Sequence, residues 1–370
     1  MKESNYRESD FNLNGLHTWF NNFSHPLIIS GPCSAESYDQ VMKTANALHD
    51  TGLVSVFRSG IWKPRTRPNG FEGRGEEALQ WIVEAKERFG FLTTVEVATP
   101  AHVELCLKHG IDLLWIGART SVNPFSIQEL ADTINGVDIP VLVKNPVNPD
   151  LNLWIGVLER FYKAGIKKLA AVHRGFTIFE KTPYRNAPLW EIPIELKRLF
   201  PELPVLCDPS HIAGNRELIP DVAQKAFLLD MNGLMVETHI DPANAMTDAA
   251  QQLTPQQLVQ LIENLDIPDS SAHTPCKEIE VLRSKIDDCD FKLIQSLADR
   301  MELVKQIALL KKECKLPVLQ VNRWNQILET RIKAAELKGM NREMIKKVLE
   351  LIHAESISLQ TRIIPRSENL

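Results

Sequence analysis

Positively charged side chains gather in one segment near the N-terminus, VFRSGIWKPRTRPNG, residues 56–70. Four of them fall within ten positions, namely Arg58, Lys63, Arg65 and Arg67. The chain as a whole is mildly acidic, with a formal net charge of -5. Because nucleic acids require a broad basic face, we expect no nucleic-acid partner and interpret this local charge as a binding site for small anions.

Three further cations stand where other apolar runs end: Arg119 in IGARTSV, Lys144 in LVKN and Arg174 in VHRGF. Basic side chains at such positions are often solvated rim charges. Here they would repel one another unless an anion lay between them, and guanidinium and ammonium groups suit phosphate and carboxylate oxygens. The pattern predicts a pocket for more than one phosphate, shared with the first segment.

Side chains that can bind a metal recur at equivalent places. Cys33 ends the run LIISGPC, His211 lies in DPSHIAG, and Glu237 and Asp248 lie in ETHIDPANAMTD. Alone, a buried cysteine is usually a small hydrophobe, and a single His or Asp near a loop is usually a cap or a surface group. Together these ligand types suit one divalent transition metal ion such as Mn, Fe, Zn or Co. His239 is a competing ligand candidate.

The elements that would position these residues are eight short runs, mostly of continuous Val, Ile and Leu. Such runs are typical of parallel strands covered on both faces, and helix-like segments separate them. Eight units predict an α/β fold, a (β/α)8 TIM barrel over residues 1–266 with its active site at the carboxyl ends of the strands. An open doubly wound sheet is the alternative, but the first run is not followed by a GxGxxG turn. The strands are expected at 27–33, 54–60, 91–97, 112–118, 140–145, 167–175, 204–210 and 233–239.

The segment IPDSSAHTPC, residues 267–276, interrupts this pattern and predicts a linker. Residues 277–370 are expected to form an all-α domain of three helices. The first, over 277–313, would be about 55 Å long at 1.5 Å per residue, and shorter helices are expected at 322–337 and 342–362. Because two short helices cannot cover the apolar stripe of the long one, we predict a homodimer through the long first helix.

The long helix carries three cations with an informative spacing. Arg283 and Arg300 are 17 residues apart, hence about 25 Å along the axis, so one small ligand cannot touch both within a single chain. Arg300 and Lys311 lie three turns apart on nearly the same face and could bracket a dianion. An antiparallel partner helix would bring its own Arg283 to that pair, which predicts two shared sites per dimer. The alternative is a solvated charged face.

The motifs SGPCSAES, KPRTRP, GAR, DPSH and MVETH resemble those of 3-deoxy-D-arabino-heptulosonate 7-phosphate (DAHP) synthases, most closely the short bacterial type I form. The resemblance spans nearly the whole predicted barrel. It implies condensation of phosphoenolpyruvate with erythrose 4-phosphate, the first step of the shikimate pathway to the aromatic amino acids. The metal ligands it implies are Cys33, His211, Glu237 and Asp248, for one divalent metal ion, with Mn favoured and Fe, Zn or Co as alternatives. The phosphoenolpyruvate site it implies consists of Arg58, Lys63, Arg119, Lys144 and Arg174, and the erythrose 4-phosphate site of Arg65 and Thr66.

The implied reaction agrees with these residue types. A bound metal would act as a Lewis acid on the aldehyde oxygen, and fixed cations would stabilise the charge that develops on nearby oxygens. We interpret Lys63 as the proton donor to the aldehyde oxygen and Glu96 as the residue that steers the attacking water. A distant rival is the synthase of 3-deoxy-manno-octulosonate 8-phosphate, which takes arabinose 5-phosphate and has an Asn-Arg-Ser type motif where this chain has Pro-Arg-Thr.

The tail is similar to the all-helical chorismate mutases, which implies rearrangement of chorismate to prephenate. The matched substrate-binding positions are Arg283, Arg300, Lys311, Arg323 and Gln360, with Lys311 and Gln360 at the ether-oxygen contacts. Gln320 and Trp324 depart from the family, which often has acids there. The departure leaves open that the tail is mainly a regulatory module, one that binds prephenate or chorismate and has weak mutase activity.

Taken together, these features predict a bifunctional enzyme, a transferase fused to an isomerase. An allosteric link, in which a ligand of the tail restrains the barrel, is a further hypothesis. The N-terminus lacks the apolar core of a secretory signal, and apolar runs fall short of the ~18 residues of a membrane span. The six cysteines lack a disulfide-like spacing. We therefore expect a cytoplasmic protein without a membrane partner.

Overall fold

The computed structural model describes residues 11–20, 25–63, 70–268 and 276–364. The chain divides into two compact units, Met1–Ser270 and Ser271–Leu370. The helices of the described segments are too short or too polar to cross a membrane.

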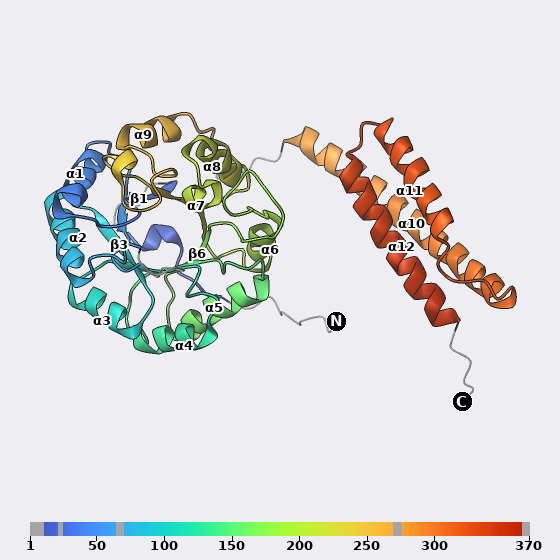
Figure 1. Cartoon of the computed structure of the whole chain (residues 1–370), viewed down its shortest axis with the longest axis horizontal. Coiled ribbons are helices and arrows are strands. Elements are labelled where there is room, and N and C mark those ends of the chain that lie inside the picture. Colours follow the sequence, from blue (N-terminus) through green and yellow to red (C-terminus); the bar gives the residue numbers. More distant parts are fainter. Residues whose placement is uncertain (1–10, 21–24, 64–69, 269–275, 365–370) are drawn as a thin grey trace. The chain divides into compact units, whose positions relative to one another are not determined.

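The first unit is a closed barrel of eight parallel strands (Figure 1). Each strand pairs with the next along the chain, and β8 returns to pair with β1, where Leu27 is in register with Gly233. The sequence-based prediction of a (β/α)8 barrel is confirmed. The strands are β1 Leu27–Gly31, β2 Val56–Ser59, β3 Leu92–Val97, β4 Leu113–Ile116, β5 Val141–Lys144, β6 Leu169–His173, β7 Val205–Cys207 and β8 Gly233–Glu237.

Helices surround the barrel in Figure 1. Many begin at a residue whose side chain accepts a hydrogen bond from the first helical turn, as Ser37, Thr99 and Asn123 do. The α-helices of this unit are α1 Tyr38–His49, α2 Glu76–Phe89, α3 Pro100–Lys108, α4 Pro124–Thr133, α5 Leu151–Lys163, α6 Glu191–Leu199, α7 Pro209–Ala213, α8 Ile219–Leu228 and α9 Pro255–Glu263. The 3-10 turns are η1 Leu16–Thr18, η2 Arg216–Leu218 and η3 Pro242–Asn244.

The core of this unit has two layers, as a barrel requires. One lies between the strands and the surrounding helices. The other fills the barrel interior, where Leu16 and Trp19 pack with inward-facing residues such as Leu113 and Trp115. The backbone N–H of Asn14 donates to Lys167 O, just before β6, so this N-terminal segment covers the amino end of the barrel. The carboxyl end remains available for chemistry.

The described residues of the second unit form three helices, α10 Lys277–Glu313, α11 Val321–Glu336 and α12 Arg342–Ile363. At 1.5 Å per residue, α10 is about 55 Å long, whereas α12 is about 33 Å long. The described residues of this unit therefore leave much of the apolar stripe of α10 uncovered. Leu282, Ile286 and Leu293 are 57%, 58% and 60% exposed.

Candidate active sites

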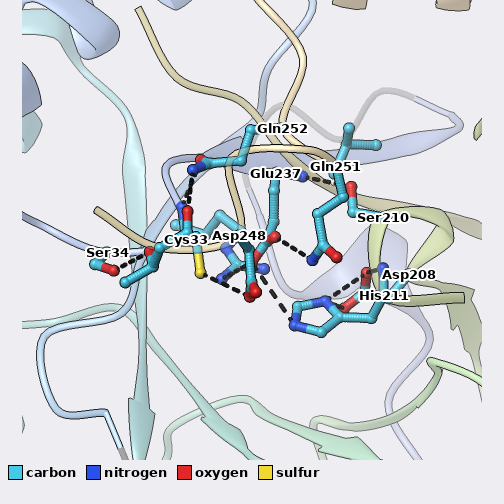
Figure 2. Close-up of polar contacts among 12 residues, drawn as sticks. Cys33, Ser34, Asp208, Ser210, His211, Glu237, Asp248, Gln251 and Gln252 are labelled. Atoms are coloured by element: carbon cyan, nitrogen blue, oxygen red, sulfur yellow. Dashed lines mark hydrogen bonds and ion pairs between the residues drawn. The ribbon is translucent and has the colours of Figure 1, made fainter. Parts of the chain in front are cut away.

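Three candidate metal ligands converge at the carboxyl end of the barrel. Cys33 follows β1, Glu237 ends β8, and Asp248 lies in the segment after η3. Their ligand atoms, the thiol sulfur and one oxygen from each carboxylate, all lie within 4.8 Å of one another. Cys33 Sγ donates a hydrogen bond to Asp248 Oδ2 at 3.3 Å. Figure 2 shows these side chains grouped together, as the spacing of the motifs predicts.

His211, the fourth candidate, lies beside this group on α7. Its Nε2 atom is 3.7 Å from Glu237 Oε1, and its Nδ1 atom is 2.8 Å from Asp208 Oδ2. Asp208 also accepts a hydrogen bond from the backbone N–H of His211 and so caps α7. A carboxylate beside Nδ1 favours a proton on that atom, so Nε2, which faces the other candidates, is the atom that would bind a metal. Sequence reasoning missed this role of Asp208, although the residue stands in the DPSH motif.

His239, the competing candidate, has other partners. Its Nδ1 atom accepts a hydrogen bond from the backbone N–H of Asp241, and its Nε2 atom is 3.6 Å from Glu36 Oε2. Alternation along a strand would place residues 237 and 239 on one face, but β8 ends at Glu237. His239 therefore follows a different backbone path and lies outside the ligand group.

Electrostatics at this group depend on burial and on the neighbouring charges. Burial, reinforced by the charge of Glu237, raises the pKa of the Cys33 thiol to about 12. Burial also acts to raise the pKa of each acid, but His211 and Arg58 bring the pKa of Glu237 below its usual value. In the same way, His211 and Arg185 lower the pKa of Asp248. The acids are therefore ionised, and a divalent cation would favour the thiolate beside them.

The residues present fit a divalent metal. Among the described residues, the buried atom Glu237 Oε1 has no hydrogen-bond donor, although Arg58 Nη2 lies 3.3 Å away in an ion pair. An unsatisfied buried carboxylate oxygen is costly, and a cation would satisfy it. A thiol, an imidazole and two carboxylates form a donor set suited to Mn, Fe, Zn or Co.

Two buried cations flank Trp115 beside this group. The guanidinium carbon of Arg58 is 4.7 Å from the ring centroid, and Lys144 Nζ is 5.8 Å from it. Lys144 Nζ pairs with Asp208 Oδ2 at 2.6 Å. Within the part of the chain that the structure describes, Arg58 Nε and Nη1 lack hydrogen-bond partners. These buried donors are available to an anion.

Two further predicted cations act on the same region. Arg174 follows β6, where its Nη1 atom donates to Asn186 Oδ1 at 2.9 Å, and Arg119 follows β4. Burial lowers the pKa of Arg174 to about 10, with contributions from the charges of Arg185 and Arg119. The guanidinium of Arg174 remains charged at neutral pH. Arg119 is exposed but lies close enough for its charge to act on Arg174, and its place in a shared anion pocket stays a prediction.

Lys63 connects the anion side of the site to the metal side. Its Nζ atom donates to Cys33 Sγ at 3.1 Å. A Cβ atom at Gly60 would lie 2.6 Å from this Nζ atom and 2.6 Å from the backbone atom Cys33 O, and the backbone contact requires glycine. Burial acts to lower the pKa of Lys63, but Cys33, Glu237 and Glu96 raise it above its usual value. Glu96 lies on β3, close enough for its charge to act on Lys63.

Two predicted residues, Arg65 and Thr66, lie outside the described residues. Their proposed contacts with erythrose 4-phosphate stay a prediction.

The helical unit contains a second site, a cavity of about 540 Å³ lined by residues from all three helices. Arg300 Nη1 donates to Ser356 Oγ at 2.6 Å, and Lys311 Nζ donates to Val318 O at 2.6 Å. Among described residues, the buried atom Gln360 Oε1 lacks a hydrogen-bond donor. Four of the five predicted residues line this cavity: Arg300, Lys311, Arg323 and Gln360.

The fifth, Arg283, is not among the residues that line the cavity. It is exposed near the start of α10, where its Nη1 atom pairs with Glu280 Oε1 at 2.5 Å. The rise of an α-helix explains this separation from Arg300. Its arrival from a partner chain stays a prediction.

The two positions that depart from the mutase pattern, Gln320 and Trp324, also line the cavity. Trp324 stacks on His353, with ring centroids 3.9 Å apart and an interplanar angle of 7°. Burial and the charges of Arg300 and Lys311 lower the pKa of His353. The departures therefore lie inside the site, where they can change what it recognises.

Sequence reasoning also missed Arg185 and Gln251. Arg185 Nη1 donates to Asp248 Oδ1 at 2.9 Å and to Gln251 Oε1 at 2.7 Å. Gln251 Nε2 donates to Glu237 Oε2 at 2.6 Å. Both residues lie in long loops, after β6 and after β8, and neither belongs to the strand ends or motifs that identified the other candidates.

Comparisons with known proteins agree with this geometry. Residues 22–269 match the model of the DAHP synthetase I family, and residues 282–361 match chorismate mutase type II. The phospho-2-dehydro-3-deoxyheptonate aldolase of Thermotoga maritima is 32% identical over 238 residues, which cover 64% of this chain and 68% of that protein. A crystal structure of the DAHP synthase of Thermotoga maritima has a TM-score of 0.58 and 30% identity, and the match covers 64% of this chain and 67% of that one.

A 2-dehydro-3-deoxyphosphooctonate aldolase from Methylococcus capsulatus is 26% identical over 276 residues, which cover 66% of this chain and 89% of that protein. The family match of the barrel spans well over half of the chain, and the mutase match falls within the helical unit. The chain therefore belongs to the DAHP synthetase I family, and with its C-terminal chorismate mutase type II domain it is a DAHP synthase–chorismate mutase fusion, a bifunctional enzyme of the shikimate pathway.

Proposed function

We propose that the barrel, residues 1–266, performs a metal-dependent condensation of phosphoenolpyruvate with erythrose 4-phosphate. Residues 277–370, after a linker at 267–276, rearrange chorismate to prephenate. The observation that carries the first activity is that buried Arg58 lies beside the metal-binding side chains. Its Nη2 atom is 3.3 Å from Glu237 Oε1, and its Nε and Nη1 atoms lack hydrogen-bond partners among the described residues.

In this proposal the cations of the barrel bind and orient phosphoenolpyruvate. Arg58, Lys144 and Arg174 hold its phosphate and carboxylate, and Arg119 completes the pocket. Fixed cations in a buried site stabilise developing oxyanions without reorganisation. Carbon 3 of phosphoenolpyruvate attacks the aldehyde carbon, water adds at carbon 2, and the phosphate leaves.

The metal ligands in this proposal are Cys33, His211, Glu237 and Asp248. A divalent metal bound there would supply Lewis-acid polarisation of the aldehyde oxygen. Lys63, whose raised pKa keeps it protonated at neutral pH, donates a proton to that oxygen, and Glu96 orients the water. Arg65 and Thr66 bind the phosphate end of erythrose 4-phosphate.

Lys63→Ala in the full chain tests the barrel mechanism. Loss of a general acid should lower the synthase turnover by about 10²–10⁴-fold, measured by consumption of phosphoenolpyruvate with erythrose 4-phosphate. Mutase activity serves as the internal control and should not change. Near-normal synthase turnover would remove Lys63 from the mechanism.

A chelator tests the proposed metal dependence, and a comparison of two sugar phosphates tests the proposed substrate. Removal of divalent metal should abolish synthase activity, and Mn should restore it. Erythrose 4-phosphate should be strongly preferred over arabinose 5-phosphate. A preference for the pentose phosphate would favour the rival octulosonate activity.

For the helical unit we propose that Arg300, Lys311, Arg323 and Gln360 bind chorismate, together with Arg283 from a second chain. Lys311 and Gln360 would contact the ether oxygen, and the arginines would hold the two carboxylates. The observation that supports this is a cavity lined by these cations and a buried amide oxygen that lacks a donor among the described residues. The uncovered stripe of α10 supports a homodimer.

Arg300→Ala in the full chain tests the mutase. Chorismate consumption should fall by at least about 10²-fold, because a charge-assisted contact to a carboxylate is lost, while synthase activity serves as the control. If the unmutated chain binds prephenate but does not turn over chorismate, the regulatory alternative is supported instead.

The allosteric hypothesis is tested by adding prephenate, tyrosine or phenylalanine during the synthase assay. Unchanged synthase turnover with all three would refute it.

A further inference from the structure

In each of the two acids of the proposed metal site, Asp248 and Glu237, one carboxylate oxygen is hydrogen-bonded and the other faces the candidate ligands. Asp248 Oδ1 accepts a hydrogen bond from Arg185 Nη1 at 2.9 Å, and Glu237 Oε2 accepts one from Gln251 Nε2 at 2.6 Å. Their other oxygens face the remaining candidate ligands. Asp248 Oδ2 is 3.3 Å from Cys33 Sγ, and Glu237 Oε1 is 3.7 Å from His211 Nε2. One oxygen of each acid is therefore tied, and the other faces the metal side.

Arg185 and Gln251, the two residues that donate to these acids, are also bonded to each other. Arg185 Nη1 also donates to Gln251 Oε1 at 2.7 Å. Because the amide oxygen of Gln251 faces this guanidinium, its NH₂ group must face Glu237. Figure 2 shows the amide of Gln251 directed at Glu237. Arg185 thus orients one acid directly and the other through Gln251.

Arg185 stands on a backbone segment that is held in place. Its N–H donates to Ala213 O at 3.2 Å, and the next residue donates to Ile212 O at 3.2 Å, both on the helix that carries His211. Gly214 has φ +67°, and a Cβ there would lie 2.3 Å from Arg185 Cβ. A side chain at Gly214 would therefore displace Arg185 from this position.

Gln251 and Asp248 are constrained as well. Gln251 is 1% exposed, and its backbone N–H donates to Asp248 O at 3.1 Å. Asp248 has φ +48°, a left-handed conformation that costs on the order of 1 kcal/mol for most residues. Such strain persists only where neighbouring contacts hold it, and this turn presents Asp248 to Cys33 on one side and to Arg185 on the other.

We propose that Arg185 and Gln251 act as one positioning unit that selects which oxygen of Asp248 and of Glu237 is presented to the divalent metal. The inference rests on the proposed metal dependence of the barrel. Residues that orient metal ligands in this way typically change metal affinity by about 10–100-fold when they are removed.

The test is direct metal binding by the full chain with Arg185→Met, Gln251→Met and both together. Mn and Co dissociation constants are measured by competition with a chromophoric chelator, and thermal melting verifies that each variant is folded. We expect each single variant to bind about 10–100-fold more weakly. Because the two act as one unit, the double variant should lose much less than the product of the single losses. Arg185→Lys, which keeps the charge but not the planar fork, should recover part of the affinity.

Matched controls come from exposed positions away from the site. Arg198→Met, on α6, and Gln128→Met, on α4, remove the same chemical groups and should leave the dissociation constants unchanged. The visible spectrum of the Co-loaded protein gives a second readout, which should change in the site variants and not in the controls.

Whether the variants bind metal more weakly or more tightly distinguishes a positioning role of Arg185 from simple charge competition. If Arg185 were merely a cation competing for Asp248, its removal would tighten metal binding, and tighter or unchanged binding by folded variants would overturn the inference. An additive double variant would overturn the idea of one unit. If the unmodified chain binds neither metal, the metal dependence itself is wrong, and this inference falls with it.

Discussion

Arg58 lies in the proposed anion site, where some of its own hydrogen-bond donors have no partner among the described residues. It is 1% exposed, pairs with Glu237 at 3.3 Å and lies over Trp115. Two of its nitrogens lack hydrogen-bond partners among the residues that are described. Buried donors without partners destabilise a fold, and an anion bound there would satisfy them.

This reasoning predicts that inorganic phosphate stabilises the barrel through Arg58. At about 100 times its dissociation constant, phosphate should raise the free energy of unfolding by ~2.7 kcal/mol. A thermal melt with and without phosphate should show the shift in the unmodified chain and little of it in Arg58→Met. Arg198→Met is the control, with a normal shift expected. An equal phosphate response from Arg58→Met would mean that the anion binds elsewhere.

At the scale of elements, α7 shows how a short helix can organise a site. It has five residues and begins after Asp208 at the end of β7. Asp208 caps the helix, orients His211 and pairs with Lys144 Nζ at 2.6 Å. Burial acts to raise the pKa of Asp208, but His211 and Lys144 hold it well below its usual range. One carboxylate thus links the proposed metal site to the anion pocket.

Asp208→Asn should therefore destabilise the barrel by about 3–5 kcal/mol, because Lys144 would remain buried without its counter-charge. Urea unfolding followed by tryptophan fluorescence measures the loss. Adding Lys144→Met should recover part of it, since the uncompensated charge is then removed. The control is Asp138→Asn, which removes the exposed partner of Lys168 and should cost less than about 1 kcal/mol. Equal losses at positions 208 and 138 would contradict this account.

At the scale of the whole molecule, the described residues of the helical unit leave the first half of its longest helix largely exposed. The side chains of Leu282, Ile286 and Leu293 lie on the first half of α10 and are more than half exposed. Arg283 is in the same half, whereas the cavity is lined by the second half of α10. Both observations are explained if a second chain covers the stripe and brings its own Arg283 to the cavity.

A complementation experiment tests this arrangement. Arg283→Ala and Arg300→Ala should each abolish mutase activity alone. When the two variants are refolded together in equal amounts, half of the dimers contain one chain of each. Each mixed dimer has one site with both arginines intact and one with neither, so about a quarter of normal activity should return. Ile286→Glu, which places charge in the stripe, should give monomers in sedimentation, whereas Lys292→Glu should not. Activity that does not return on mixing would place Arg283 in its own chain's site or outside the site.

The sequence by itself determined the architecture and most of the proposed site. Continuous apolar runs predicted the eight parallel strands, because strands buried on both faces need no alternation, and helical periodicity predicted the bounds of α10 as Lys277–Glu313. Strand ends then identified Cys33, Arg58 and Glu237, because every strand of a barrel ends at the same rim.

Only the tertiary structure decided which side chains touch. Loops after the strands have no fixed period, so their direction cannot be derived from spacing. For this reason Arg185, Gln251 and the roles of Asp208 were not predicted, and His239 could not be separated from Glu237. Contacts between residues such as Arg185 and Asp248, 63 positions apart in the chain, depend on how the loops after β6 and β8 pack against each other at the rim.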